Sequence, residues 1–372
     1  MYKEVSVFSA LMLFLMSTCN GERVVCGFSG SATGRSGEYA FEIADIPTSL
    51  CTHVLGDPME IDMFTSELLF GMGPFEEVEN RWKQLLELKR TKPDLKLLAS
   101  VRSPIILQVA AENKSRRTLI ESILRHMEWL QVDGVELFWG GIGPDDAMYT
   151  LLEELKSSLI AAGHPAWEVI VFVEIDHGTI DHGRLCRLAD YVHVLGMGER
   201  KPKYSDNSST PVVKATFDVD ELKNITLERA LQYWIDKSCP ANKLVLGLVF
   251  GAQPFTLSAD TVQTDDAPEE QATFCSFTME TMCSYVTLCQ KFNESAWTMG
   301  WDDTEGLAPH AFQGDRWVAY ENEASLGRKS EMAKGKNLAG VYAIAVDLDD
   351  YRNKCGTLYP LTVALSKSYK SA

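Results

Sequence analysis

The sequence predicts an α/β fold, a closed (β/α)8 TIM barrel formed by most of the chain. Short apolar runs alternate with longer amphipathic stretches from Arg23 onward, as parallel strands and their connecting helices do. Eight such runs occur, which is the number of strands that closes this barrel. The chain has 372 residues, which suits one large barrel with an insertion or two ordinary domains, and the eight runs favour one barrel.

The predicted strands are short apolar runs bounded by turn-forming residues. They cover residues 24–28, 51–55, 95–101, 134–139, 168–173, 191–195, 244–250 and 340–346. Three predicted helices, at 75–90, 116–130 and 227–235, carry apolar residues at three- and four-residue spacing. They precede the third, fourth and seventh strands, so we expect their apolar stripes to pack on the barrel.

The first 19 residues have the pattern of a secretory signal peptide. Lys3 lies in a short charged start, residues 8–16 are an apolar core, and Ser17, Thr18 and Cys19 form a small-residue cleavage site. The core is too short to span a bilayer, and no later segment reaches about 18 uninterrupted apolar residues. We therefore expect a secreted protein without a membrane span, with residues 20–372 forming the barrel domain.

The composition limits the classes of partner and of bound group that we expect. The net charge of −17 disfavours nucleic acid and anionic membranes as partners. Nine cysteines become eight if Cys19 leaves with the signal, and an even number suits an oxidising compartment. None has the spacing of a tetrahedral zinc site, so neither a metal nor a cofactor is expected. Acceptor sequences for N-glycosylation occur at Asn113, Asn207, Asn224 and Asn293.

The fourth predicted strand, with the residue before it, reads Asp133-Gly134-Val135-Glu136-Leu137-Phe138-Trp139-Gly140. Because alternate side chains of a strand point the same way, Glu136, Phe138 and Gly140 share one face, and that face has a single carboxylate. The run resembles the D-G-x-D-x-D-x-E motif of glycoside hydrolase family 18, the chitinases and chitinase-like proteins. Asp133 matches the first motif Asp.

The resemblance implies that the catalytic groups are missing. Glu136 stands at the second motif Asp, Phe138 at the third, and Gly140 where the family has its catalytic Glu. Glycoside hydrolysis needs a proton donor at the leaving oxygen, and glycine has no proton to give. General acid catalysis is worth roughly 10²–10⁴-fold, so we expect no useful chitinase activity and assign no catalytic residue.

The resemblance extends from VVC at Val24 to YPL at Tyr359. It is supported by LCTH at Leu50, KLVLGLVFG at Lys243, PFTL at Pro254, GDRWVAYE at Gly314 and DLDDYRNKCG at Asp347. It implies a small α+β insertion after the seventh strand, at about 252–314. It also implies disulfides joining Cys26 to Cys51 and Cys283 to Cys355. The other four cysteines could pair as neighbours in sequence order, Cys186 with Cys239 and Cys275 with Cys289.

Five residues mark the remnant of the family's substrate cleft at the C-terminal ends of the strands. Arg102 replaces a glycine of the family's S-x-G-G, and Met197 lies in a run that replaces M-x-Y-D. Gln253 replaces a cation, and Ile344 replaces the tryptophan on which a sugar stacks. Trp139 is the fifth, with core packing as the first interpretation and ligand contact as the second. We therefore expect chitin binding to be weak at most.

The predicted function is that of a secreted, monomeric, non-catalytic chitinase-like protein. It would act as an extracellular signalling, growth or immune-modulating factor through an unknown extracellular protein or glycan. One alternative is a lectin that binds chitin or another glycan. Another is an enzyme with relocated chemistry around Glu136 or a loop with His177 and His182, to which His193 would add a metal ligand. For Glu136 we expect instead a neighbouring Arg, Tyr or backbone donor, and for the histidines ordinary polar loop roles.

Overall fold

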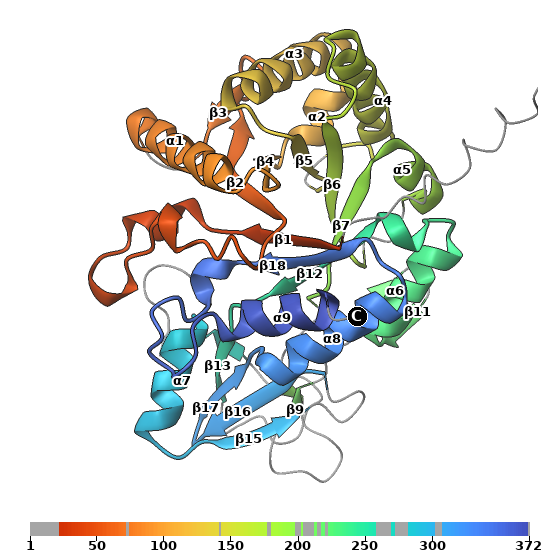
Figure 1. Cartoon of the computed structure of the whole chain (residues 1–372). Helices are drawn as coiled ribbons and strands as arrows, with labels where there is room; N and C mark the ends of the chain where they lie inside the picture. Colours follow the sequence, from red (N-terminus) through yellow and green to blue (C-terminus); the bar gives the residue numbers. More distant parts are fainter. Residues whose placement is uncertain are drawn as a thin grey trace, which may run out of the picture.

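The computed structural model describes residues 22–71, 74–140, 143–176, 180–197, 202–203, 212–213, 217–219, 222–257, 269–271, 282–301 and 307–370. At its centre is a closed barrel of eight parallel strands (Figure 1), whose circle is completed by pairing of β1 with β2. Around the barrel the order is β1 (Arg23–Gly27), β18 (Gly340–Ile344), β12 (Leu244–Val249), β7 (Tyr191–Leu195), β6 (Glu168–Glu174), β5 (Gly134–Phe138), β4 (Lys96–Val101) and β2 (His53–Ile61). The predicted TIM barrel and its eight strands are confirmed.

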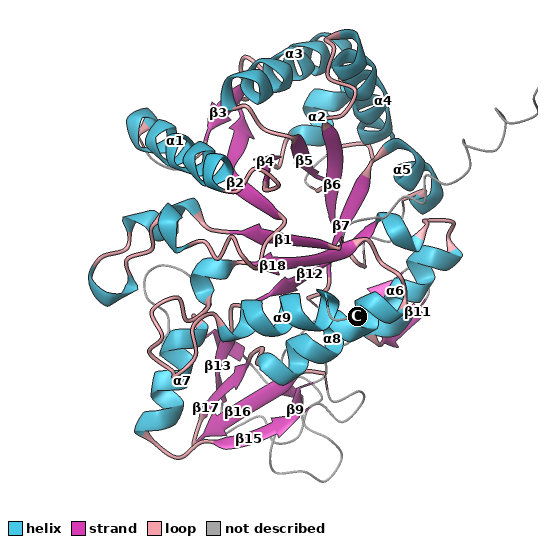
Figure 2. Ribbon diagram, viewed as in Figure 1, coloured by secondary structure: helices cyan, strands magenta, loops and turns pink. Residues whose placement is uncertain are grey.

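Helices surround the strands, as Figure 2 shows. They are α1 (Phe75–Thr91), α2 (Ile106–Ala111), α3 (Asn113–Leu130), α4 (Asp146–Ala161), α5 (His182–Leu188), α6 (Leu227–Asp236), α7 (Tyr285–Glu294), α8 (Glu323–Gly335) and α9 (Pro360–Lys370). Side chains cap several of them: Asp181 accepts from the backbone of Arg184 at α5, and Thr226 from that of Arg229 at α6. The three predicted helices correspond to α1, α3 and α6.

Two segments with short strands outside the barrel were not predicted. Strand β2 continues past Leu55 into an antiparallel hairpin with β3 (Leu68–Phe70). Between β7 and α6 lie four short strands, β8 (Pro202–Lys203), β9 (Val212–Val213), β10 (Phe217–Val219) and β11 (Leu222–Ile225). Strands this short carry too few residues to show an alternating pattern in the sequence.

After β12 the chain forms a second, antiparallel sheet with α7 beside it, below the barrel in Figure 1. Its order is β14 (Glu269–Gln271), β13 (Gln253–Leu257), β17 (Arg316–Ala319), β16 (Pro309–Gln313) and β15 (Thr298–Trp301). The sheet therefore extends to Ala319, beyond the expected end of the insertion at residue 314.

The barrel strands separate two apolar layers. Outward-facing side chains such as Val24, Leu97 and Val135 join the helices in one large core. The inward-facing side chains form a smaller cluster drawn from the strands, which includes Leu98 and Tyr342. This alternation means that every inward position of a strand meets either that small cluster or a polar partner.

A buried ionic cluster fills the floor of the barrel, at the N-terminal ends of the strands. The Glu168 carboxylate accepts from the Arg23 guanidinium, and from Lys96 Nζ at 2.6 Å. His53 Nε2 lies 2.8 Å from Arg23 Nη1 and its Nδ1 lies 2.7 Å from Thr52 Oγ1, so we infer a neutral ring that donates through Nδ1. Burial, followed by the charge of Arg23, lowers the pKa of His53 to about 4 despite Glu168 nearby.

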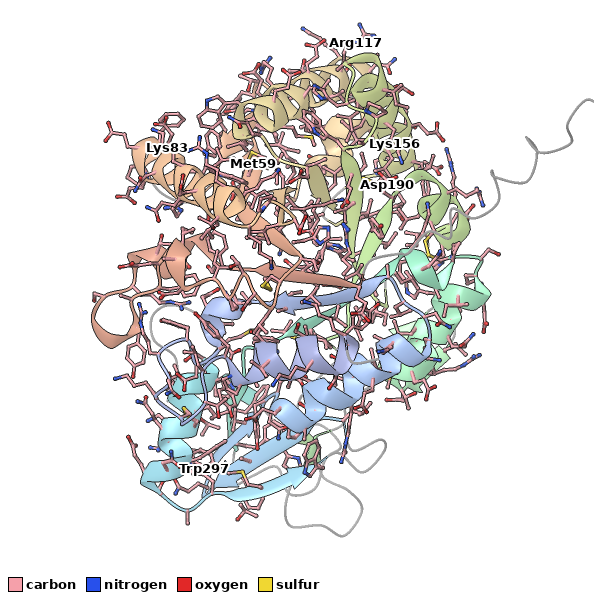
Figure 3. All side chains as sticks on the ribbon, in the orientation of Figure 1. Met59, Lys83, Arg117, Lys156, Asp190 and Trp297 are labelled. Carbon is pink, nitrogen blue, oxygen red and sulfur yellow. A yellow bond between two sulfur atoms is a disulfide. The ribbon has the colours of Figure 1, made fainter. Side chains whose placement is uncertain are left out.

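Two aspartates before barrel strands act as matching clamps. Asp133 accepts from the backbone of Leu97 at 2.8 Å and from Lys89 of α1 at 2.6 Å. In the same way Asp190 accepts from the backbone of Val169 at 2.8 Å and from Lys156 of α4 at 2.6 Å (Figure 3). Each carboxylate fixes the start of the neighbouring strand and one helix. The motif residue Asp133 therefore has a structural role at the barrel floor.

The disulfides agree with the expectations in part. Cys26 is bonded to Cys51 and Cys186 to Cys239, as expected. The expected bond from Cys283 to Cys355 is wrong, because Cys355 is bonded to Cys289. Cys283 precedes α7 and pairs through its backbone with Ala252, whereas Cys289 lies on the helix itself. Because Cys289 is bonded to Cys355, the expected pairing of Cys289 with Cys275, which lies outside the described residues, is also wrong. Cys283 is disulfide-bonded too.

Three of the four predicted glycosylation sites lie within the described residues, at Asn113, Asn224 and Asn293, and all three are exposed. Asn207 and the expected signal peptide lie outside them. Within the described part of the chain, no helix combines the length and apolar character that crossing a membrane requires.

The floor cluster makes folding stability depend on pH. The pKa of His53 is about 4 in the folded chain against an ordinary 6.5, so the unfolded chain binds the proton first. Between pH 6.5 and about pH 4 the proton binds the unfolded chain and not the folded one. We therefore expect the free energy of unfolding to fall by about 3 kcal/mol as the pH drops through this range. Urea unfolding of the wild type and of His53→Gln at each pH measures the difference, because glutamine accepts from Arg23 without titrating.

The control is His164→Gln, since His164 stacks on Trp167 at the surface. This variant should keep the wild-type pH slope. Equal slopes for His53→Gln and the wild type would contradict the assignment of a neutral buried His53.

Candidate functional site

The candidate site is the barrel mouth, where the C-terminal ends of the strands meet. A pocket of about 210 Å³ opens there between β1, β2, β4 and β18. Its lining includes Gly27, Asp57, Ser100, Arg102, Tyr342 and Ile344. Of the five predicted cleft residues, Arg102 and Ile344 therefore line this pocket.

Glu136 of β5 is fully buried beneath the pocket and paired with His193 of β7. Its Oε2 accepts from His193 Nδ1 at 2.6 Å, and its Oε1 lies 3.4 Å from Ser100 Oγ and 3.5 Å from Arg102 Nη2. Burial alone would raise the pKa of Glu136, but His193 and then Arg102 outweigh burial and lower it. Burial also lowers the pKa of His193. The pair is thus a carboxylate that accepts from a neutral imidazole.

That protonation state leaves His193 Nε2 as an acceptor. This nitrogen is buried and has no hydrogen-bond partner among the residues that the structure describes. The ring lies 5.2 Å from the ring of Tyr342. Glu136 is therefore held by a histidine, an arginine and a serine, in line with the expectation of a neighbouring donor.

Aromatic rings fill the space above this pair. Phe138 packs on Phe172 of β6 with ring centroids 6.1 Å apart, and Phe172 meets Tyr342 at 6.3 Å. The Arg102 guanidinium carbon lies 4.7 Å from the centre of the Phe172 ring. Arg102 thus joins the aromatic layer to the buried carboxylate, and its side chain is still 37% exposed.

Two glycines make room for these rings. A Cβ at Gly140 would stand 2.4 Å from ring atoms of Phe138, and a Cβ at Gly27 would stand 2.8 Å from the Tyr342 hydroxyl. Real Cβ atoms do not approach so closely, so each glycine and its aromatic neighbour form a matched pair. Gly140 is therefore the residue that the position of Phe138 allows.

Asp57 adds a second carboxylate to the pocket lining. Its Oδ2 accepts from Arg81 Nε at 2.6 Å, and its Oδ1 has no hydrogen-bond partner within the described part of the chain. Burial raises the pKa of Asp57. Asp57, Ser100 and Tyr342 were not predicted as site residues, although Tyr342 is two residues before Ile344 and so shares its face of the strand.

Trp139 does not belong to this site, and its prediction as a cleft residue is wrong. It is 1% exposed, its ring meets Tyr149 of α4 at 5.0 Å, and its Nε1 donates to Asp145 at 3.1 Å. The alternation that turns Glu136 and Phe138 inward turns Trp139 outward, against the helices. The first interpretation, core packing, is the one that the structure bears out.

The other two predicted cleft residues are half-buried. Met197 follows β7, and Gln253 lies in β13, paired with Ala319 of β17. Neither is among the residues that line the pocket.

The histidines expected in the metal alternative lie apart. His182 packs edge-on against Trp234 of α6 at 4.4 Å, outside the barrel, whereas His193 is inside with Glu136. His177 lies outside the described residues. Among the described residues no group of three or more His, Cys, Asp or Glu side chains could hold a metal ion.

Comparison with known proteins identifies the barrel. The sequence profile described as "Glycosyl hydrolases family 18" matches residues 23–349. The endochitinase of Manduca sexta is 28% identical over 384 residues, which cover 94% of this chain and 68% of that protein. The crystal structure of Ostrinia furnacalis Group IV chitinase superposes with a TM-score of 0.79 at 26% identity, covering 94% of this chain and 99% of that one.

Human YKL-39 has the same fold, with a TM-score of 0.78 at 22% identity and coverage of 94% of this chain and 100% of that one. It is described as a pseudo-chitinase with retained chitooligosaccharide binding properties.

The matched pair at the barrel mouth can be tested by substitution. We expect Gly140→Ala to lower the free energy of unfolding by about 1–3 kcal/mol, because the new methyl group meets the Phe138 ring. The same substitution in a Phe138→Ala background should cost much less. Urea unfolding of the four members of this double-mutant cycle measures the coupling.

Gly335→Ala at the end of α8 is the control, since a Cβ there meets no atom within 4 Å. It should leave stability unchanged or raise it slightly. Equal costs of Gly140→Ala in both backgrounds would disprove the steric coupling.

Proposed function

The chain belongs to family 18 of the glycosyl hydrolases, and we propose that it is a chitinase-like member that does not hydrolyse glycosidic bonds. The observation that carries this proposal is that a glycine, Gly140, occupies the barrel mouth where the family has its catalytic Glu. Glycine has no side chain that could donate a proton, and the Phe138 ring occupies the space into which a side chain at position 140 would extend. A protein without an acid at the leaving oxygen lacks the proton transfer that glycoside hydrolysis requires.

The remaining carboxylate does not substitute for that acid. Glu136 is fully buried and its lowered pKa keeps it ionised at neutral pH. Both of its oxygens already accept from side chains of the barrel, His193, Arg102 and Ser100. It therefore has no proton to give and no open side toward a substrate, which argues against relocated chemistry.

The role that we propose is extracellular signalling, growth control or immune modulation through a protein or glycan partner. Secretion is supported by the signal-like sequence of the first 19 residues. The disulfides Cys26–Cys51, Cys186–Cys239 and Cys289–Cys355 suit an oxidising compartment. The net charge of −17 favours protein or neutral glycan partners over nucleic acid.

Glycan binding without hydrolysis is the second candidate. It is favoured by the pocket of about 210 Å³ at the barrel mouth, whose lining offers Arg102, Ser100 and Asp57 as polar contacts. It is disfavoured by Ile344, which offers a sugar a smaller stacking surface than an indole ring would. We therefore expect binding of chito-oligosaccharides to be weak.

Hydrolysis is tested first. We expect no turnover of a fluorogenic chitotrioside by the purified mature protein, even at high protein concentration, because Gly140 supplies no proton. An active family 18 chitinase in the same assay shows that the conditions support turnover. Turnover that disappears in Glu136→Gln would contradict the proposal and favour relocated chemistry.

Glycan binding is tested by isothermal titration with chitohexaose. We expect a dissociation constant weaker than about 1 mM, that is, a binding free energy smaller in size than about 4 kcal/mol. A constant in the micromolar range that is lost in Arg102→Ala, but kept in the surface control Arg184→Ala, would instead favour the lectin. Arg102 lines the pocket, whereas Arg184 lies on α5 over Tyr149.

A further inference from the structure

Exposed apolar side chains gather at one corner of the barrel. Eight large hydrophobic side chains are exposed among the described residues, and five of them lie on the β2–β3 hairpin, the start of α1 and the end of α3. They are Met63, Phe64, Leu69, Phe75 and Trp129. Figure 1 shows β3 between α1 and α3. Leu69 lies on the other face of the hairpin from Phe70, and we call the other four, with the half-buried Phe70, the aromatic corner. Clustered exposure of this kind marks an interaction site more often than scattered apolar residues do.

Three rings of the corner pack against one another. The Phe70 ring meets Phe75 at 5.7 Å and Trp129 at 5.3 Å, and Phe75 meets Trp129 at 6.2 Å. These three rings, with Arg125 and His126, line a hollow of about 270 Å³. Even so, Phe75 stays 56% exposed and Trp129 46% exposed.

The turn at the tip of the hairpin is held by hydrogen bonds to Asp62. Asp62 Oδ1 accepts from the backbone nitrogens of Phe64 and Thr65, each at 2.8 Å, which fixes the turn. The turn presents Phe64 to solvent with 88% of its surface exposed. At the base of the tip, Glu67 pairs with Arg125 of α3 at 3.0 Å, which connects the tip to the ring cluster.

The rim of the corner is acidic. Glu76 and Glu77 at the start of α1 are exposed, and Glu60 of β2 is exposed on the other face of the hairpin, beside Leu69. None of the three forms an ion pair with another described residue. The nearby cations are already neutralised, Arg125 by Glu67 and Lys83 by Glu79 at 2.9 Å, with Lys83 labelled on α1 in Figure 3. The corner therefore combines apolar rings with two first-turn carboxylates that pair with no cation among the described residues.

We propose that the aromatic corner binds a protein partner through a segment that carries apolar side chains flanked by lysine or arginine. The apolar side chains of such a segment would enter the hollow between Phe70, Phe75 and Trp129, where aromatic residues make effective anchors. Its cations would meet Glu76 and Glu77, which directly follow Phe75, and could also lie over the exposed ring faces. This surface lies on the outside of the barrel, and the inference goes beyond the proposed absence of hydrolysis.

Two other occupants fit the corner less well. A second copy of this chain would bring a second acidic rim against the first, and like charges oppose such a contact. A pyranose could stack on Phe75 and Trp129, whose rings lie at 20° to each other, but it carries no cation to meet the carboxylates beside them. A peptide segment with apolar and cationic side chains would use both the rings and the carboxylates.

The test titrates the purified protein with a helical peptide of leucine, tryptophan and lysine, and with a matched peptide in which every lysine is glutamate. We expect the basic peptide to bind with a dissociation constant on the order of 10 µM, more weakly at high salt, and the acidic peptide not to bind. The double variant Phe75→Ser/Trp129→Ser should raise the constant by at least about tenfold. Glu76→Gln/Glu77→Gln should raise it severalfold and flatten its salt dependence.

The control is Ile160→Ser, which removes an exposed apolar side chain on α4 that does not line the hollow. It should bind the basic peptide as the wild type does. Absence of peptide binding, equal binding of the acidic peptide, or equal losses in Ile160→Ser and the corner variants would each overturn the proposal. So would self-association or chitohexaose binding that depends on Phe75 and Trp129, which would assign the corner to a second copy or to a glycan.

The proposed function and this inference can fail separately. Turnover of the chitotrioside would overturn the first and leave peptide binding at the corner unaffected. Loss of peptide binding would leave the barrel mouth as described.

Discussion

The organisation of the barrel mouth depends on one hydrogen bond, between the fully buried carboxylate of Glu136 and His193 at 2.6 Å. A charge inside a closed barrel is costly unless it is paired, so the strands around it must supply partners. β7 supplies His193, and β4 supplies Ser100 with Arg102 directly after it. With Arg102 beside Glu136, its guanidinium group lies over the ring of Phe172. The contacts of Phe172 with Phe138 and Tyr342 then complete the aromatic layer.

This arrangement explains why the changes at the mouth occur together. The Phe138 ring occupies the space beside Gly140, and the Tyr342 hydroxyl occupies the space beside Gly27. Restoring a carboxylate at position 140 alone would therefore place it against a ring. The mouth is a repacked core whose parts fit one another, with a small polar pocket left between β1, β2, β4 and β18.

The fold could be predicted from sequence because the barrel strands are short, mostly apolar runs, whereas the hairpin strand β3 has three residues and shows no pattern. The site could be predicted only where strand alternation or the family resemblance determines it. Alternation puts Glu136 and Phe138 inside, and it also turns Trp139 outward, a consequence that the prediction of a cleft residue overlooked. The pairing of Glu136 with His193 was out of reach, because the two residues are 57 positions apart and meet through the stagger of three strands. The bond of Cys355 to Cys289 instead of Cys283 depends on how α7 is placed, which spacing does not determine.

A barrel that has lost chemistry at its mouth still keeps the constraints that hold it together. Asp133 matches the family motif, yet here it clamps β4 and α1, as Asp190 clamps β6 and α4. Both lie at the end of the barrel away from the mouth, so they have no part in the changes around Glu136. Apolar surface that stays exposed, in contrast, contributes no burial to folding and favours aggregation unless a partner covers it. The concentration of exposed apolar side chains around Phe75 and Trp129 is therefore a cost that binding would offset, and Glu76 and Glu77 beside them pair with no cation within the described part of the chain.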